Sequence, residues 1–208
     1  MQGYLASISY VDHQLGRLLD ALDASPMKDN TIIVLWSDHG FHIGEKQNWE
    51  KFALWDQTTR VPFFVHAPGV SLDGAATRQP TTLTDIYPTL CELAKLPVPE
   101  LCTGVSLVPQ LKNPKAPRER MALTAFQFWN EKTPSLAVAD SRYRFIRYGD
   151  GFEELYDLEK DPHEFKNLIA DPRLAKVKMR LANALPKKVT PIQKIPQDSP
   201  FHRGRKRN

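Results

Sequence analysis

An apolar run that stops abruptly at polar residues is the strongest constraint on how this chain can fold. Residues 31–36 form the run, and Ser37, Asp38, His39 and Gly40 follow directly. Such a run is typical of a buried strand in an α/β protein, and open α/β sheets place ligands at the carboxyl ends of their strands. The sequence therefore predicts a core strand that delivers the Asp38 carboxylate and the His39 imidazole to a sheet edge.

The elements around this strand indicate an α/β core. Residues 4–22 carry apolar side chains at intervals of three and four, which predicts an amphipathic helix. Residues 61–67 predict a second core strand, and Thr84 is the expected N-cap of a helix that ends near Ala94. We expect the two strands to be parallel, but a parallel sheet needs several strands and cover on both faces. The pattern thus predicts an incomplete core.

Beyond Pro97 the predicted elements become short. Three segments separated by turn residues predict a small antiparallel sheet, and an amphipathic helix is expected near residues 173–185. We divide the chain into an α/β part, a small α+β subdomain and a tail, which cover residues 1–112, 113–185 and 186–208. The three strand segments are residues 136–139, 143–148 and 154–158.

The tail at residues 186–208 carries most of the positive charge. It holds seven Lys and Arg against one Asp, a net +6, which leaves −2 of the total +4 for the remaining residues. Its four prolines and few large apolar residues predict a disordered extension. No run approaches the roughly 18 apolar residues of a membrane span, and Met1 is not followed by a signal-peptide pattern. We expect no nucleic-acid or membrane partner and leave the localisation open.

Groups that could hold a metal and an anion follow the first predicted strand. The Asp38 carboxylate suits calcium or magnesium, whereas the His39 imidazole is commoner on zinc, so the pair leaves the metal open and cannot complete a site alone. Lys51 lies shortly after in the chain. An ammonium beside a metal is expected where the charge of a sulfate or phosphate must be neutralised. The alternative is that Lys51 is an ordinary surface charge, and we favour the functional interpretation.

The same loop holds weaker candidates. His42 and Lys46 could also hold an anion, and Trp49 and Trp55 are interleaved with them. The alternative is that Lys46 is an ordinary surface charge and that the two tryptophans pack in the core or at its rim. We favour a role outside the site for all four residues, His42 included.

Motifs around the candidate site occur in a recognisable order. Near the site they read Ser37-Asp-His-Gly-Phe-His-Ile-Gly-Glu45, Trp49-Glu-Lys51 and Thr59-Arg-Val-Pro62. Residues 3–19 precede them, and residues 84–90, 104–107 and 154–168 follow. Together they resemble the carboxyl-terminal half of a type I sulfatase, most closely iduronate-2-sulfatase and its bacterial relatives. The resemblance extends from residue 3 to about residue 185.

The resemblance implies an alkaline-phosphatase-like α/β fold, in which helices flank a mixed sheet. Here that core would be incomplete and followed by a small subdomain with a four-stranded antiparallel sheet and a helix. It assigns Asp38 and His39 to a divalent cation site, with calcium expected, and Lys51 to contact with the sulfate. Phe41, with His42, Lys46 and Trp49, is a weaker candidate for substrate binding. The implied substrate is a sulfated sugar or another sulfate ester.

One essential part of the family's chemistry is missing from these residues. The family's nucleophile is a formylglycine made within a Cys/Ser-x-Pro-x-Arg motif, but no proline here has Cys or Ser two positions before it. We therefore expect a truncated or split sulfatase that is inactive alone and pairs with a complementary amino-terminal fragment. Members of the family are usually periplasmic, secreted or lysosomal.

Three other interpretations remain. Related enzymes hydrolyse phosphate or phosphonate esters with a similar metal site. The chain could instead be a non-catalytic fragment that binds polyanions through its tail, such as glycosaminoglycans or nucleic acid, in which case binding would weaken steeply with salt. It could also be a degenerate remnant without a stable fold, because a two-strand sheet exposes an edge and an apolar face.

Overall fold

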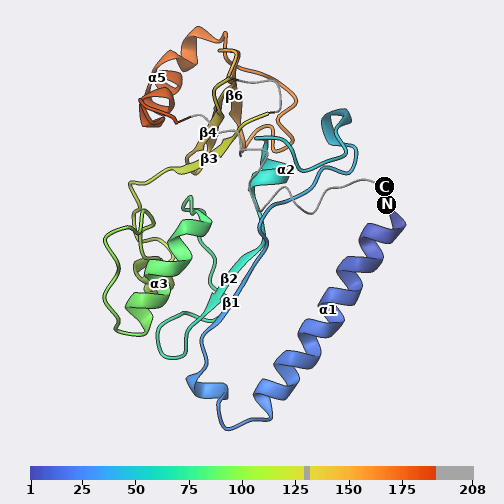
Figure 1. Ribbon diagram of the computed structural model, residues 1–208, viewed down its shortest axis with the longest axis vertical. Coiled ribbons are helices and arrows are strands. Elements are labelled where there is room, and N and C mark those ends of the chain that lie inside the picture. Colours follow the sequence, from blue (N-terminus) through green and yellow to red (C-terminus); the bar gives the residue numbers. More distant parts are fainter. Residues whose placement is uncertain (129–131, 191–208) are drawn as a thin grey trace, which may run out of the picture.

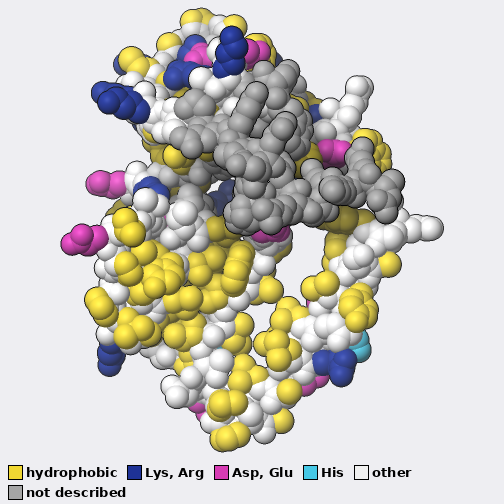
Figure 2. All heavy atoms as spheres, in the orientation of Figure 1, with side chains coloured by type: hydrophobic (Ala, Val, Ile, Leu, Met, Phe, Trp, Pro, Cys, Tyr) yellow, Lys and Arg dark blue, Asp and Glu magenta, His cyan; other side chains and the backbone are white. Residues whose placement is uncertain are grey.

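The computed structural model describes residues 1–128 and 132–190. Its first helix, α1 (Gln2–Asp23), forms where the apolar periodicity predicts one. No residue of α1 is buried, and the large apolar side chains of Leu5, Ile8 and Val11 are exposed. The helix stands apart from the sheets in Figure 1, and hydrophobic side chains lie along it in Figure 2. Most of its apolar face is therefore without cover in the described part of the chain.

A short 3-10 helix, η1 (Lys28–Asn30), leads to a two-stranded sheet of β1 (Ile33–Trp36) and β2 (Phe63–His66). The strands are antiparallel, with Ile33 opposite His66 and Trp36 opposite Phe63, so the prediction of parallel strands is wrong. Parallel strands need a crossover connection, usually a helix. The connection here leaves and re-enters at the same end of the pair and holds only η2 (Glu45–Gln47) and α2 (Asp56–Thr59).

The prediction of a buried first strand is also wrong for this chain. Three residues of β1 are only partly buried, and the side chain of Trp36 is 49% exposed. On β2, Phe64 is 62% exposed. The apolar run gives the strand its conformation, but the described residues cover these positions only in part.

The helix that follows begins with a capping box. Thr82, rather than the predicted Thr84, is the N-cap, and its side chain and that of Asp85 each bond the other's backbone N–H group. The 3-10 helix η3 (Leu83–Asp85) then continues into α3 (Ile86–Leu93). The fully buried Asp85 carboxylate also accepts hydrogen bonds from Val105 N and Arg118 Nη2, at 2.8 and 2.7 Å. These bonds fasten the start of α3 to the chain around α4 (Val108–Lys112).

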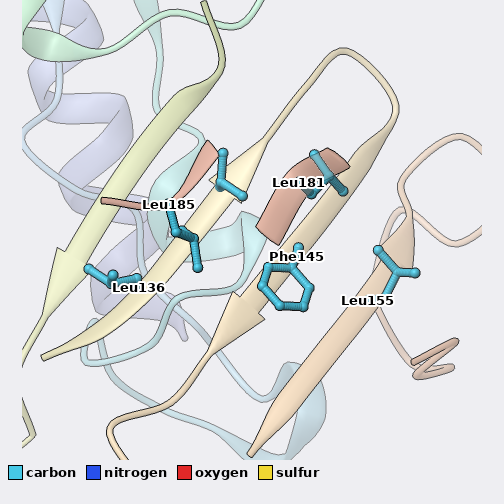
Figure 3. Packing of buried hydrophobic residues seen from close by; sticks show 6 residues of the cluster. Leu136, Phe145, Leu155, Leu181 and Leu185 are labelled. Carbon is cyan, nitrogen blue, oxygen red and sulfur yellow. The ribbon is translucent and has the colours of Figure 1, made fainter. Parts of the chain in front are cut away.

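Beyond α4 the chain forms an antiparallel sheet in the order β3-β4-β5-β6. The resemblance correctly implies four strands, whereas the residue pattern alone finds three and misses β3. On one face the sheet is covered by η4 (Pro172–Leu174) and α5 (Ala175–Ala184), where a helix is predicted. The strands are β3 (Ala122–Phe126), β4 (Ser135–Ala139), β5 (Tyr143–Arg147) and β6 (Glu153–Asp157). The buried cluster on the α5 face comprises Leu136, Val138, Phe145, Leu155, Leu181 and Leu185 (Figure 3).

The opposite face of this sheet holds part of the loop between β1 and β2. Leu54 is fully buried there against Ala137, Ile146 and Tyr156. These three residues alternate with the α5-facing residues along their strands, because successive side chains of a strand point to opposite faces. The four-stranded sheet is thus joined directly to the loop that carries the predicted site residues.

The predicted disordered tail, residues 186–208, is described only as far as residue 190. Residues 191–208, most of the predicted disordered tail, lie outside the described residues. Among residues 1–128 and 132–190, no helix combines the length and apolar character that crossing a bilayer requires. The domain limits at residues 112 and 185 stay a prediction.

Candidate functional site

The turn after β1 is held by backbone contacts with the α2 segment. Gly40 N donates to Thr58 O at 2.9 Å, and the Ser37 hydroxyl donates to His39 O at 2.8 Å. A Cβ atom on Gly40 would lie 2.0 Å from Gln57 O, closer than packed atoms can approach. Only glycine therefore lets the Asp38-His39 turn lie this close to α2.

Asp38, His39 and Lys51 meet at this turn. His39 Nδ1 lies 2.8 Å from Gly40 O, and Lys51 Nζ lies 2.9 Å from His39 Nε2. A carbonyl oxygen can only accept and an ammonium can only donate, so these two contacts fit the imidazole tautomer that carries its proton on Nδ1. Asp38 Oδ2 is 3.5 Å from the same Nε2 atom. The structure thus brings the three sequence-predicted residues together.

The meeting point is open to solvent. The Asp38 side chain is 81% exposed and that of His39 36%. All three residues line one broad hollow, whose other walls include residues of β2, β3 and the segment before α3. A small anion or an ester could therefore reach Lys51.

The donors present fit part of a metal site. A carboxylate and an imidazole Nε2 lone pair are both metal ligands, and the bond from Nδ1 to a backbone carbonyl is the usual support of a ligating histidine. Among the described residues, however, no group of three or more His, Cys, Asp or Glu could hold a metal ion. Calcium takes six to eight oxygen ligands, so Asp38 and His39 amount to part of a site.

The weaker candidates Phe41, His42 and Trp49 lie elsewhere, and none of them lines the hollow. The ring of Phe41 stacks on Tyr4 of α1, with centroids 5.7 Å apart. His42 is fully buried, its ring edge-on to Trp55, and burial lowers the pKa of its imidazole. Trp49 is exposed beside Gly44. The structure does not bring these side chains to Lys51.

Lys46 is neither at the hollow nor an ordinary surface charge, so the latter interpretation is wrong. Its ammonium donates to Glu164 O at 2.7 Å and to the Tyr156 hydroxyl at 3.0 Å. It also lies 4.0 Å from the centroid of the Trp55 ring, a cation–π contact. Burial lowers the pKa of the Lys46 ammonium. Lys46 therefore fastens η2 to the four-stranded sheet.

Sequence reasoning missed a buried ionic cluster beside the site. Arg144 on β5 lies between two carboxylates, with Nη2 2.6 Å from Asp56 Oδ1 and Nε 2.9 Å from Glu164 Oε1. Burial raises the pKa of the Glu164 carboxyl to about 7, and the Arg144 charge opposes that rise. The only signal in the sequence is that Glu164 falls within the 154–168 motif, because the three residues are far apart along the chain.

Comparisons with known proteins point to the same family. A model of the family described as Sulfatase matches residues 1–96. A sulfatase of Formosa agariphila is 42% identical over 167 residues, which cover 80% of this chain and 32% of that protein. A Delta 4,5-hexuronate-2-O-sulfatase of Bacteroides thetaiotaomicron is 35% identical over 190 residues, which cover 84% and 38%. The chain spans about a third of the length of these relatives.

Solved structures share the fold. A structure in complex with D-glucosamine-2-N,6-O-disulfate matches with a TM-score of 0.75 and 27% identity, over 86% of this chain and 38% of that one. The phosphonate monoester hydrolase of Agrobacterium radiobacter matches with a TM-score of 0.71 and 30% identity, over 85% and 38%. The predicted α/β fold of the alkaline-phosphatase-like class is confirmed.

Proposed function

Because this chain belongs to the sulfatase family, we propose that it is the carboxyl-terminal part of a sulfuric ester hydrolase. In this proposal Asp38 and His39 supply part of a divalent cation site, with calcium expected, and Lys51 contacts the sulfate. The observation that carries the proposal is the convergence of Asp38 Oδ2 and Lys51 Nζ on His39 Nε2, within 3.5 and 2.9 Å.

Each residue has a definite part in this chemistry. A bound cation would polarise a sulfuryl oxygen as a Lewis acid. The Gly40 carbonyl keeps the His39 proton on Nδ1, so that the Nε2 lone pair stays available as a ligand. When Nε2 is engaged, the Lys51 ammonium loses its acceptor and is free to neutralise charge that develops on the sulfuryl oxygens.

We further propose that these 208 residues are inactive alone and act with a complementary amino-terminal part. The chain contains no Cys/Ser-x-Pro-x-Arg motif, and a covalent sulfoenzyme requires the nucleophile made there. The partial metal site and the uncovered apolar face of α1 support the same proposal. That face and the exposed side of β1 and β2 are where the complement would pack.

The proposed substrate is a sulfated sugar, and within that class a 2-O-sulfated uronic acid. The resemblance to iduronate-2-sulfatases supports this choice, as does the likeness to a protein named as a hexuronate-2-O-sulfatase. The similar structure that holds a disulfated glucosamine supports the wider class of sulfated sugars.

Complementation tests the proposal. The chain would be co-expressed with the part of the Formosa agariphila sulfatase that it does not match, and assayed on an aryl sulfate and a 2-O-sulfated hexuronate disaccharide. We expect activity that requires both parts, disappears with a chelator and returns with calcium. Lys51→Met should abolish it, whereas Lys28→Met should not, because Lys28 is an exposed lysine of η1. Activity of the chain alone would overturn the split-protein proposal, and equal activity of Lys51→Met would overturn the role of Lys51.

A second candidate function is phosphonate or phosphate ester hydrolysis. The likeness to the Agrobacterium radiobacter phosphonate monoester hydrolase favours it, since the fold and this part of the chain are shared. Matched aryl sulfate, aryl phosphate and phenyl phosphonate substrates separate the two in the complemented protein. A higher kcat/KM on the phosphorus esters would favour this second function.

A further inference from the structure

The segment just after Lys51 is held at two backbone positions by side chains of the carboxyl-terminal subdomain. Arg144 Nη1 donates to Leu54 O at 3.3 Å, and Asp56 N donates to Glu164 Oε2 at 2.6 Å. Arg144 also binds the Asp56 carboxylate through Nη2, as described above. The backbone three and five residues after Lys51 is therefore fixed from β5 and from the turn that follows β6.

The same segment holds the Asp38-His39 turn. Gly40 N donates to Thr58 O, and Gly40 packs directly on Gln57 O. The Thr58 hydroxyl in turn bonds Ala53 O and Trp55 O, at 2.9 and 3.0 Å, which closes the segment on itself. A continuous set of contacts thus runs from Arg144 through residues 53–58 to Gly40.

A buried cluster of charged residues adds little to the stability of a fold, so stabilisation alone does not account for this one. Arg144, Asp56 and Glu164 are all nearly inaccessible to solvent. Removing charges from water costs free energy that their attraction only partly returns, and buried ion pairs can often be replaced by apolar residues without loss. What such a cluster provides is directed geometry, because the planar guanidinium fixes several partners at once.

We propose that Arg144, together with Glu164 and Asp56, positions the Lys51 ammonium against His39 from the carboxyl-terminal sheet. These are positioning residues, since none of their described contacts is with Lys51 or His39 themselves. The proposal relies on the proposed function only for what Lys51 contacts. The coupling between the cluster and the turn can be tested on the chain whatever reaction it serves.

Arg142 offers a matched control. It lies one residue before β5 and forms its own ion pairs with Asp157 and Glu159, at 2.8 and 3.5 Å. Arg142→Met therefore removes ionic contacts of the same sheet without touching residues 53–58. Amide hydrogen exchange at Gly40 reports on the turn, because this N–H group bonds Thr58 O. Exchange at Leu168, whose N–H group bonds Leu155 O, reports on the sheet.

The expected result is local. Arg144→Met should raise the exchange rate of the Gly40 amide at least tenfold relative to that of Leu168, whereas Arg142→Met should leave this ratio within about twofold. Arg144→Lys keeps a charge but cannot reproduce both hydrogen bonds of the guanidinium, to Leu54 O and Asp56 Oδ1, so its exchange ratio should lie between those of Arg144→Met and Arg142→Met. Glu164→Gln keeps the shape of the side chain and gives a milder form of the same test if Arg144→Met does not fold. A Gly40-to-Leu168 ratio that is unchanged in the folded Arg144 and Glu164 variants, or changed equally by Arg142→Met, would overturn the proposal. Absence of hydrolysis by the parent chain in the complementation assay would instead contradict only the proposed function.

Discussion

Lys51 Nζ lies 2.9 Å from His39 Nε2, so the proposed sulfate contact and a proposed metal ligand already touch each other. A cation bound at Nε2 would replace this hydrogen bond, so in the proposed site cation binding would release the Lys51 ammonium. Two neighbouring polar groups of this kind need a fixed spacing, which the loop between β1 and β2 supplies through its contacts with the four-stranded sheet.

Replacement of Lys46 by methionine should destabilise the folded chain, whereas replacement of Lys51 by methionine should not. Lys46→Met removes two hydrogen bonds and leaves buried acceptors unpaired, so we expect the free energy of unfolding to fall by about 1–3 kcal/mol. Lys51 is exposed, and Lys51→Met should change it by less than about 0.5 kcal/mol. Urea unfolding of both variants measures the difference. Equal destabilisation by the two substitutions would contradict the structural role given to Lys46.

Gly40→Ala should loosen the turn that carries the site. The added methyl group would meet the Gln57 carbonyl, so the backbone must shift and the bond from Gly40 N to Thr58 O must lengthen. We expect a loss of about 1–3 kcal/mol in the free energy of unfolding. Gly16→Ala on α1 is the control, because nothing lies within 4 Å of its added Cβ and alanine favours a helix by up to about 1 kcal/mol. A Gly40→Ala chain as stable as the parent in urea would show that the contact yields easily.

Asp38→Asn should separate metal binding from folding. The Asp38 carboxylate is exposed, so its loss should change the unfolding free energy by less than about 0.5 kcal/mol. In the complemented protein the same substitution should raise the calcium concentration needed for half-maximal activity, because a neutral amide is a weaker ligand than a carboxylate. Calcium titration after chelator treatment measures this. An unchanged calcium requirement would remove Asp38 from the metal site.

Local sequence patterns predict the helices and strands of this chain better than they predict what packs against them. The periodicity of residues 4–22 locates α1, and the apolar run locates β1, because both patterns act over short distances. The direction of β2 depends instead on where the connecting loop returns, which no local pattern records. The exposure of β1 and of α1 depends in the same way on what packs against them.

The residues of the site also differ in how far the sequence predicts them. Asp38, His39 and Lys51 could be grouped from their order in the chain, because a sheet edge and one loop bring them together. Lys46 could not be assigned, since its backbone adopts a φ of 54°, which few residues other than glycine do, and its partners Tyr156 and Glu164 lie 110 and 118 residues away. Asp56 pairs locally with Arg60, but its two buried partners, Arg144 and Glu164, lie 88 and 108 residues away, a separation that only the folded structure closes.

Glu164 should make the stability of this chain depend on pH near neutrality. Burial raises the pKa of its carboxyl to about 7 from an ordinary value of 4.5. The groups that face it are the Arg144 guanidinium and the Lys46 ammonium, which oppose the rise, and the Asp56 carboxylate, which adds to it. A group whose pKa is higher in the folded state contributes stability that is complete below its unfolded pKa and is lost as the pH rises through its folded pKa. This contribution is therefore present near pH 4.5 and lost above about pH 7.

Comparison with Glu164→Gln isolates this contribution, because the other titrating groups are common to both chains. The free energy of unfolding of the parent chain, measured relative to the variant, should decrease by roughly 2–4 kcal/mol between pH 4.5 and pH 8.5. Urea unfolding at several pH values measures it, with most of the decrease expected between pH 5 and pH 7. A difference between the two chains that stays constant over this range would mean that the Glu164 carboxyl titrates normally despite its burial. An increase with pH would mean that the Arg144 and Lys46 charges outweigh the cost of burying it.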